Sequence, residues 1–250
     1  MTDGKKIALG VTSLFVLAVG VQIAYLEHRN HQAEAPPKDP YADVKLDDDD
    51  AVAYNLHKER PDSLKDERTM IGRTLWMSAG GQMDYYRATG HHVDYAHPIG
   101  TIAGATPMLI KDVFEQMPPR TGPAVFRIPA GQRHVLLAFT LPQSPDPKTL
   151  YALPVGHVED GRYDLLNDEL FFYTDPHTLY KHWGPDTWAH IDKHEVVLGM
   201  NETQAMMALG EVLKPSNFTK GERTIEFDNN GHPVTVEFVK NKAVHVTPEK

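Results

Sequence analysis

The clearest alternation of apolar and polar positions lies near the C-terminus. The first set of alternating positions is apolar and comprises Ile225, Phe227, Val234, Val236, Phe238, Val244 and Val246. The positions between them are polar and comprise Thr224, Glu226, Thr235, Glu237, His245 and Thr247. A period of two predicts an antiparallel three-stranded meander that is buried on one face and exposed on the other. Its turns are predicted at residues 228–231, which read DNNG, and at residues 241–242.

A short amphipathic helix is predicted just before these strands. Asn201 is followed three residues later by Gln204, which is the spacing of a capping box. Ala205, Ala208 and Leu209 then fall on one face, and a glycine follows. A second helical segment is predicted around residues 188–194. Two helices covering the apolar face of the meander give an ααβββ module over residues 185–250.

Residues 67–184 show a β-rich pattern. Strands are predicted at Val125–Ile128, at Val135–Thr140, on both sides of a turn at residues 159–161, and at residues 169–174. The nearly continuous apolar run VLLAF, residues 135–139, predicts a strand that is covered on both faces. A helix is predicted over residues 177–183, with Asp175 as its N-cap and Gly184–Pro185 as its end.

The longest apolar run is Ile7–Leu26, which contains no charged residue. As a helix it would span the bilayer core of roughly 30 Å. Lys5 and Lys6 precede it, so the positive-inside rule predicts a cytoplasmic N-terminus and export of the rest of the chain. Residues 1–30 are therefore interpreted as a stub and an uncleaved anchor that contacts the lipid bilayer of the inner membrane. A cleaved secretory signal ending at Ala33–Ala35 is the alternative.

A linker is predicted at residues 31–66, which are rich in proline and in acidic residues. The run Asp47–Asp50 lacks the alternating spacing of a calcium-binding loop, and we interpret it as a solvated charge run.

Composition and charge remove several classes of function. The chain has no cysteine, which excludes a disulfide framework, a thiolate nucleophile and a lipid-modified cysteine. The formal net charge of -9 argues against nucleic acid as a partner, because a binding face for phosphates is basic. The chain contains neither a Walker loop nor a nucleophile elbow, and no cofactor is predicted.

Histidines offer one route to metal chemistry. The loop GHHVDYAH, residues 90–97, brings together His91, His92, Asp94 and His97, whose nitrogen and oxygen atoms are plausible ligands. Their spacing matches no established metal motif. Hydrogen-bonded or surface histidines are the competing interpretation.

The C-terminal segment resembles a known family. Gly199 and Met200, followed by a helix that ends in Leu209, Gly210 and Glu211 and then by short strands, are similar to the small module of the BamE (SmpA/OmlA) family. The resemblance covers about residues 185–247. It implies a binding or scaffold module of the bacterial cell envelope, without catalytic residues.

Together these patterns predict an α+β protein with an N-terminal transmembrane helix, a β-rich middle domain over residues 67–184 and the C-terminal ααβββ module. The predicted function is a non-catalytic binding or scaffold protein that acts on another envelope protein. Its predicted contact residues are Glu226, Glu237 and His245 on the polar face of the meander. The alternative is a membrane-tethered enzyme or metal-binding protein that uses the His91–His97 loop.

Overall fold

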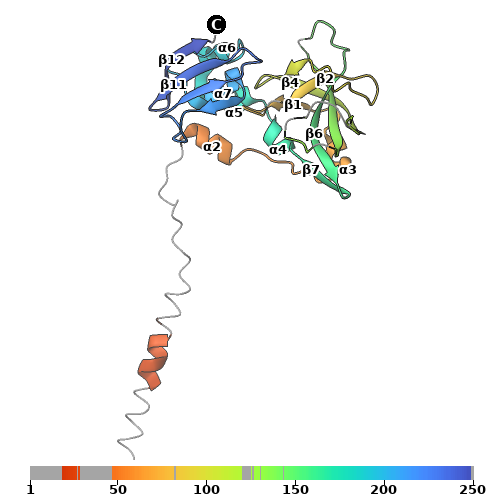
Figure 1. The fold of residues 1–250 in the computed structure, drawn as a ribbon. Helices are drawn as coiled ribbons and strands as arrows, with labels where there is room; N and C mark the ends of the chain where they lie inside the picture. Colours follow the sequence, from red (N-terminus) through yellow and green to blue (C-terminus); the bar gives the residue numbers. More distant parts are fainter. Residues whose placement is uncertain are drawn as a thin grey trace, which may run out of the picture. The chain divides into compact units, whose positions relative to one another are not determined.

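The structure is a computed structural model that describes residues 19–26, 28, 47–81, 83–119, 125, 127–129, 131–142 and 144–248. The chain divides into two units, Met1–Leu46 and Asp47–Lys250. In the first unit, residues 19–26 are helical. The second unit contains the strands of both sheets and the remaining helices (Figure 1).

The transmembrane prediction is corrected by the structure. No helix within the described residues is both long enough and apolar enough to cross a membrane. Helical residues 19–26 reach about 12 Å at 1.5 Å per residue, whereas a bilayer core is about 30 Å thick. Residues 7–18 of the predicted span lie outside the described residues. This finding overturns the predicted transmembrane helix, and with it the predicted signal anchor and inner-membrane location.

The predicted linker is folded from residue 47 onward. Helix α2, Asp48–Tyr54, starts at Asp47, whose Oδ1 accepts the backbone N–H of Asp50 at 2.7 Å. Residues 55–63, which form no regular helix or strand, lead to α3, Leu64–Glu67, and to the 3₁₀ turn η1, Arg68–Met70. The acidic run therefore begins a helix, as expected for carboxylates near a helix N-terminus.

An antiparallel sheet of eight strands forms the first part of the larger unit. Its strands are β1 Thr74–Met77, β2 Asp84–Arg87, β3 Gly100–Thr101, β4 Pro107–Gln116, β5 Arg133–Thr140, β6 Tyr151–Glu159, β7 Arg162–Leu165 and β8 Phe171–Phe172. The order is β3-β2-β6-β5-β4-β1-β8, and β7 pairs with β6. β4 pairs with β5, β5 with β6 and β6 with β7, so these four consecutive strands form a meander.

Two of the strand predictions in this part differ in outcome. β5 confirms the predicted strand, and residues 135–139 on it are fully buried, as expected for a strand covered on both faces. The predicted strand Val125–Ile128 is wrong, because its described residues are not extended and Arg127 has a φ of 62°. The neighbouring long strand is β4, whose pattern of burial is broken by a register shift between Ile110 and Asp112.

The predicted hairpin after β5 is confirmed. β6 and β7 pair across Asp160 and Gly161, which have φ values of 48° and 76°. Two consecutive positive φ values are the geometry of a tight hairpin turn, and an aspartate followed by a glycine suits it.

The strand predicted at residues 169–174 is shorter in the structure. Helix α4, Asn167–Leu170, takes its first residues, and only Phe171 and Phe172 form strand β8. Both phenylalanines are buried, but in different hydrophobic cores, since neighbouring side chains on a strand point to opposite faces. β8 is therefore the edge of the large sheet at which the two cores meet.

The helix predicted around residues 177–183 is divided in the structure. Asp175 caps α5, Pro176–Leu179, by accepting the backbone N–H of His177 at 2.9 Å. The 3₁₀ turn η2, Lys181–Trp183, follows, and α6, Gly184–Ile191, begins where the sequence predicted an end. Proline suits the first turn of α6, because that position needs no backbone donor.

The second part of the unit is an antiparallel sheet of four strands, in the order β12-β11-β10-β9. Its elements are α7 Glu202–Leu209, β9 Val212–Pro215, β10 Thr224–Phe227, β11 Val234–Val239 and β12 Lys242–Pro248. The capping box predicted for α7 is confirmed, with Asn201 and Gln204 bonded in both directions. β9 corrects the predicted ααβββ module with three strands, since it adds a fourth strand beside β10.

The predicted strand phase holds for β10 and β11 but is wrong for one residue of β12. Glu237 pairs with His245, and Phe238 pairs with Ala243, so Val244 has no partner. This β-bulge leaves the side chain of Val244 46% exposed, and Ala243 takes the buried position instead. The extra residue leaves the regular alternation, whereas His245, Val246 and Thr247 beyond it keep their predicted faces.

Helices α6 and α7 supply the cover for the inner face of this sheet. The shared core contains Trp188 and Ile191 from α6, Leu209 from α7, and Ile225 and Phe238 from the strands. A Cβ on Gly104, in the loop after β3, would lie 2.5 Å from the carbonyl oxygen of Met207. Glycine at this point therefore lets the first part of the unit approach α7 closely.

Truncation of Leu209 tests this packing. Leu209 is 4% exposed in the core, whereas His245 is exposed on the outer side of β12. We expect Leu209→Ala to lower the free energy of unfolding by about 2 to 5 kcal/mol, the usual cost of truncating a buried leucine. His245→Ala should lower it by less than about 0.5 kcal/mol. Urea denaturation of both variants measures the difference, and equal losses would contradict the assigned faces.

Candidate functional site

The histidine loop does not assemble a metal site in the structure. His91 Nε2 lies 2.8 Å from Asp112 Oδ2, and the His91 ring stacks on Phe114. His97 Nδ1 lies 2.7 Å from Asp94 Oδ2 within the loop, and His92 is exposed. Within the described part of the chain, no group of three or more histidine and carboxylate side chains could hold a metal ion. The four predicted ligands are thus divided between two separate surface pairs and one exposed ring.

The residues predicted to contact a partner do share one face. Glu237 on β11 lies between Thr224 on β10 and His245 on β12. Glu226 lies between Thr235 on β11 and Lys214 on β9. These two cross-strand rows form the outer face of the four-stranded sheet, opposite the side that packs on α6 and α7. The outer face thus has an acidic centre.

Both edge strands of this sheet carry a β-bulge with an apolar extra residue. On β9, Lys214 and Val212 pair with consecutive residues of β10, and Leu213 between them is 48% exposed. On β12, Val244 holds the equivalent position and is 46% exposed. A bulge turns one side chain away from the regular alternation. The acidic outer face is therefore flanked on both edges by an exposed aliphatic side chain.

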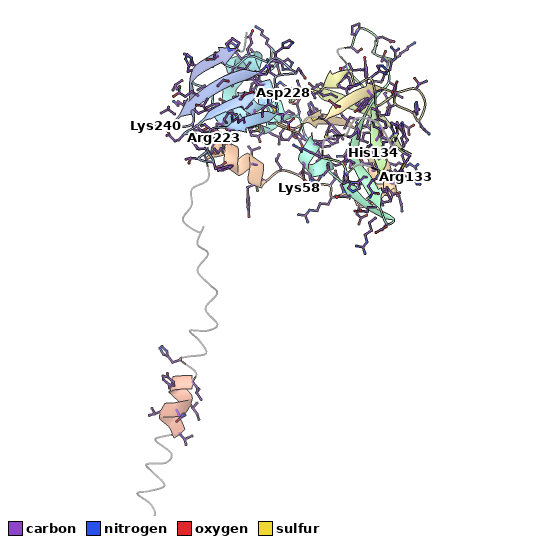
Figure 2. All side chains as sticks on the ribbon, in the orientation of Figure 1. Lys58, Arg133, His134, Arg223, Asp228 and Lys240 are labelled. Carbon is purple, nitrogen blue, oxygen red and sulfur yellow. The ribbon has the colours of Figure 1, made fainter. Side chains whose placement is uncertain are left out.

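A buried ion pair between Glu202 and Arg223 anchors the loop between β9 and β10 to α7. Glu202, at the start of α7, is 2% exposed and accepts from Arg223 Nη2 at 2.7 Å and from Arg223 Nε at 3.1 Å. The backbone N–H of Gly221 donates to the same carboxylate. Arg223 Nη1 also reaches the carbonyl oxygen of Asn217 at 3.3 Å. Figure 2 shows Arg223 in this part of the molecule, near Lys240 of the β11–β12 turn.

Phe218, the residue after Asn217 in this loop, is 95% exposed. Asn217 stabilises the loop locally, because its Oδ1 accepts the backbone N–H of Thr219 at 2.8 Å and its Nδ2 donates to the carbonyl oxygen of Glu222 at 3.1 Å.

A second buried carboxylate ties α2 to the C-terminal part. Asp49 is 8% exposed, and its Oδ1 accepts from His182 Nε2 and from Trp183 Nε1, both at 2.6 Å. Its Oδ2 accepts from Asn201 Nδ2 at 2.7 Å. The aspartate run was interpreted as a solvated charge run, and for Asp49 this was wrong. Its three donors are more than 130 residues away in the sequence, so no local pattern could have revealed them.

Removal of the Asp49 carboxylate should destabilise the protein strongly. Asp49→Ala leaves three donors without their acceptor in a mostly buried place, and we expect a loss of about 3 kcal/mol in the free energy of unfolding. Asp48→Ala is the matched control, because Asp48 is exposed in the same helical turn and contributes less than about 1 kcal/mol. Chemical denaturation of both variants decides the point. Similar small losses would show that the Asp49 contacts contribute little.

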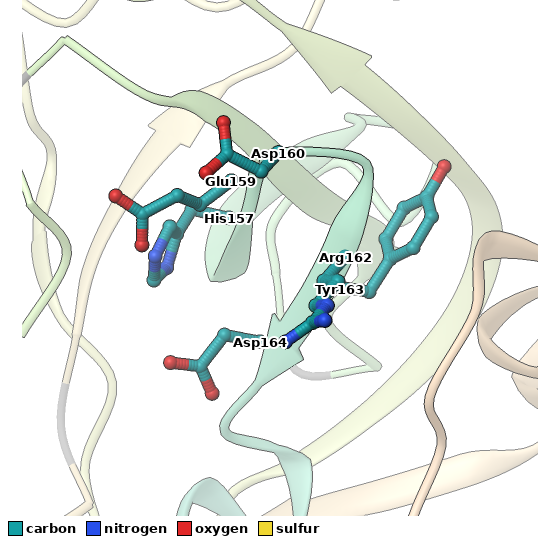
Figure 3. A pocket seen from close by; sticks show the side chains of 6 residues that line it. All are labelled: His157, Glu159, Asp160, Arg162, Tyr163 and Asp164. Carbon is teal, nitrogen blue, oxygen red and sulfur yellow. The ribbon is translucent and has the colours of Figure 1, made fainter.

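A polar pocket of about 510 Å³ lies on the β6–β7 hairpin. It is lined by His157, Glu159, Asp160, Arg162, Tyr163 and Asp164. Figure 3 shows the carboxylates of Glu159 and Asp164 on the same side of the hairpin as the imidazole of His157, while the ring of Tyr163 points the other way. The register agrees, since His157 pairs with Asp164 and Tyr163 pairs with Val158. This open surface mixes acids and bases, and it presents no activated nucleophile.

A second pocket, of about 380 Å³, lies between the two cores. Phe171, Phe172 and Tyr180 line one part of it, and Lys220 and Arg223 line another. Both cations are already engaged, Lys220 with Asp50 at 3.0 Å and Arg223 with Glu202. This pocket is therefore a packing boundary with its charges paired.

His134 is a buried histidine on the central strand β5 (Figure 2). It is 2% exposed, and its Nδ1 lies 3.0 Å from the hydroxyl of Tyr95. Burial, together with the neighbouring His157, lowers the pKa of His134 to about 4. The ring is therefore neutral near pH 7, and its place in the core of a strand indicates a structural role.

The pKa of His134 predicts sensitivity to acid. Because the folded pKa lies below the unfolded value of 6.5, the stabilising contribution is complete above about pH 6.5 and is lost as the pH falls toward 4. The shift corresponds to a loss on the order of 3 kcal/mol. Relative to the unmodified chain, His134→Gln should show a correspondingly weaker loss of stability between pH 7 and pH 4. The exposed His232→Gln variant should keep the original slope, and an unchanged slope in His134→Gln would contradict this prediction.

Comparisons with known proteins give no relative for this chain. No family model, no curated protein sequence and no solved structure matches it. The function of this chain is therefore inferred from the arrangement of its own residues.

Proposed function

We propose that the chain is a non-catalytic protein-binding module, and that its recognition surface is the outer face of the four-stranded sheet. The observation that supports this most directly is the pair of apolar bulge residues, Leu213 and Val244, on the two edge strands. The inner face of the sheet packs in the core with α6 and α7. The outer face is therefore the side of the sheet that is open to a partner.

Bulges and charged side chains are two separate devices that protect edge strands from unwanted pairing. Here both extra residues are large and aliphatic, so exposing them to water is unfavourable unless another surface covers them. Val239, on the same face by strand alternation, is 41% exposed and adds to the apolar surface. These aliphatic side chains place apolar area beside the acidic rows, so the face offers both apolar and charged surface to a partner.

The charge of this face indicates the kind of partner. Glu226 and Glu237 occupy adjacent strands, and Lys214 compensates one of them. A partner with a basic patch would complement the acidic centre, since such complementarity sets specificity and the rate of encounter. His245 stands beside Glu237 and completes the predicted contact set.

The resemblance to the BamE family supports the same proposal. In this chain, the backbone N–H of Gly199 donates to the carbonyl oxygen of Ala243 at 2.8 Å, and the N–H of Ala243 donates to the carbonyl oxygen of Met200 at 2.7 Å. The Gly-Met pair thus binds the outer edge of β12, and a φ of 93° at Gly199 explains the glycine. Gly199 and Met200 therefore hold the edge of β12 in place. In this proposal, the partner is bound by the open outer face of the sheet.

Charge reversal tests the proposed surface. We expect the double variant Glu226→Lys and Glu237→Lys to keep the melting temperature within a few degrees and to lose discrete adducts formed from a photo-crosslinking residue placed at position 247. Thr247 lies in the row of Glu226 on the same face. The physical reason is that reversal of exposed charges changes encounter and specificity more than folding.

The matched control changes the net charge by the same amount on the β6–β7 hairpin. Glu159→Lys and Asp164→Lys alter exposed residues far from the outer face in the sequence and should leave the adducts intact. Persistence of the adducts in the Glu226/Glu237 variant, or their absence from the unmodified chain, would argue against recognition by this face. Replacement of both bulge residues by serine should weaken the same adducts.

A further inference from the structure

Two buried polar atoms in the first part of the larger unit have no hydrogen-bond partner within the described residues. They are Oε2 of Glu67 and Oδ1 of Asn167. Both side chains are completely buried, with no exposed area. They face each other, because Asn167 Nδ2 donates to the other carboxyl oxygen, Oε1 of Glu67, at 2.7 Å. Unsatisfied buried polar atoms are uncommon and require an explanation.

A single proton on Glu67 Oε2 would give both of these atoms a hydrogen-bond partner. A carboxylic acid and a primary amide can form a ring with two hydrogen bonds, in which the amide N–H donates to one oxygen and the acid O–H donates to the amide oxygen. The first of these bonds is present. If Glu67 were ionised, its Oε2 and Asn167 Oδ1 would be two fully buried acceptors without a protein donor among the described residues, which is costly.

We infer that Glu67 keeps its proton in the folded chain and forms this cyclic pair with Asn167, and that the pair is a lock between α3 and α4 that closes in acid and loosens toward neutral pH. When the lock opens, the proton leaves Glu67 Oε2 for water. The lock goes beyond the proposed binding function, since it concerns a different part of the molecule.

The segment that contains Glu67 is hydrogen-bonded to α4 at two places. The backbone N–H of Glu59 donates to Asp168 Oδ1 at 3.0 Å, and the N–H of Arg60 donates to Asp168 Oδ2 at 3.2 Å. Residues 59–67 are therefore held against α4 at one end by Asp168 and at the other by Asn167. Because α4 leads directly into β8, the lock is adjacent to the strand shared by the two cores.

The ionisable groups around the pair are mostly acidic. Asp66 lies on the same helix as Glu67, Asp168 lies on α4, and Tyr173 follows β8 and donates to Asp168 Oδ1 at 2.8 Å. Glu59 comes from the incoming chain. Its carboxylate lies 2.8 Å from Arg73 Nη2 and 3.1 Å from His57 Nε2, and Arg73 also lies over the Tyr173 ring. Arg73 and His57 are thus engaged with Glu59, while Lys65 and Arg68 are the cations beside Glu67 along the chain.

Burial agrees with this geometry. It raises the pKa of Glu67 to about 7, with a smaller contribution from Asp66, and against the effect of the Asn167 hydrogen bond. Because the folded pKa lies above the unfolded value of 4.5, the contribution of the pair is complete below about pH 4.5. It decreases as the pH rises and is lost once the pH passes about 7.

The test uses the full chain and two measurements. First, the side-chain carboxyl carbon of Glu67, followed by NMR, should titrate with a midpoint near pH 7. Second, amide hydrogen-exchange protection of residues 59–67, corrected for the intrinsic rate, should fall roughly tenfold per pH unit between about pH 5 and pH 7. A Glu67 midpoint at its ordinary value near 4.5 would overturn the inference without any variant.

Glu67→Gln replaces the acid by an amide that can form the same two-bond ring with Asn167 but cannot ionise. Protection of residues 59–67 in this variant should be nearly independent of pH over the same range. Glu169→Gln is the control, because Glu169 is an exposed carboxylate on the same helix and should leave the pH response unchanged. If Glu67→Gln retains the full pH response, a different group controls the segment and the lock is wrong.

Discussion

The structure depends on the alternation of side chains along β8 and its neighbour β1. Phe171 and Phe172 are adjacent, so the pleat of the strand sends one to each face of the sheet edge. Each enters a different core. On β1, Leu75 and Met77 likewise enter the first core, while Trp76 packs against the second. Neither core can shift along this edge without disturbing the other, which explains how residues 47–250 form one compact unit with two hydrophobic centres.

Prediction from sequence succeeded where a local rule decides the structure. The capping box of α7, the Asp160–Gly161 hairpin and the buried strand β5 depend on a few neighbouring residues, and each is confirmed. The alternating face of β10 and β11 is also confirmed, and it places Glu226 and Glu237 together. These features could be predicted because their physical causes are contained in the local segment.

Three of the failures share one physical cause, which is dependence on distant residues. Asp49 is buried because His182, Trp183 and Asn201 supply donors from far along the chain. The bulge at Val244 is set by how β12 fits β11, and alternation alone predicts the wrong face for that residue. The histidine loop had a plausible ligand count, but His91 found Asp112 on β4 as its partner instead of its loop neighbours. Composition cannot distinguish these outcomes from a solvated run, a regular strand or a metal site.

Three buried carboxylates show how the available donors decide the state of a charge inside this protein. Asp49 receives three hydrogen bonds, and Glu202 receives a guanidinium and a backbone amide, so in both places the carboxylate is matched by donors. Glu67 receives one amide N–H and retains an unmatched oxygen. Desolvation is costly in all three places, and only donors or a proton can offset it. Since donors saturate the first two, those carboxylates serve as fixed ties of the fold. Where the donors are too few, a proton must complete the bonding, and that part of the fold becomes coupled to pH.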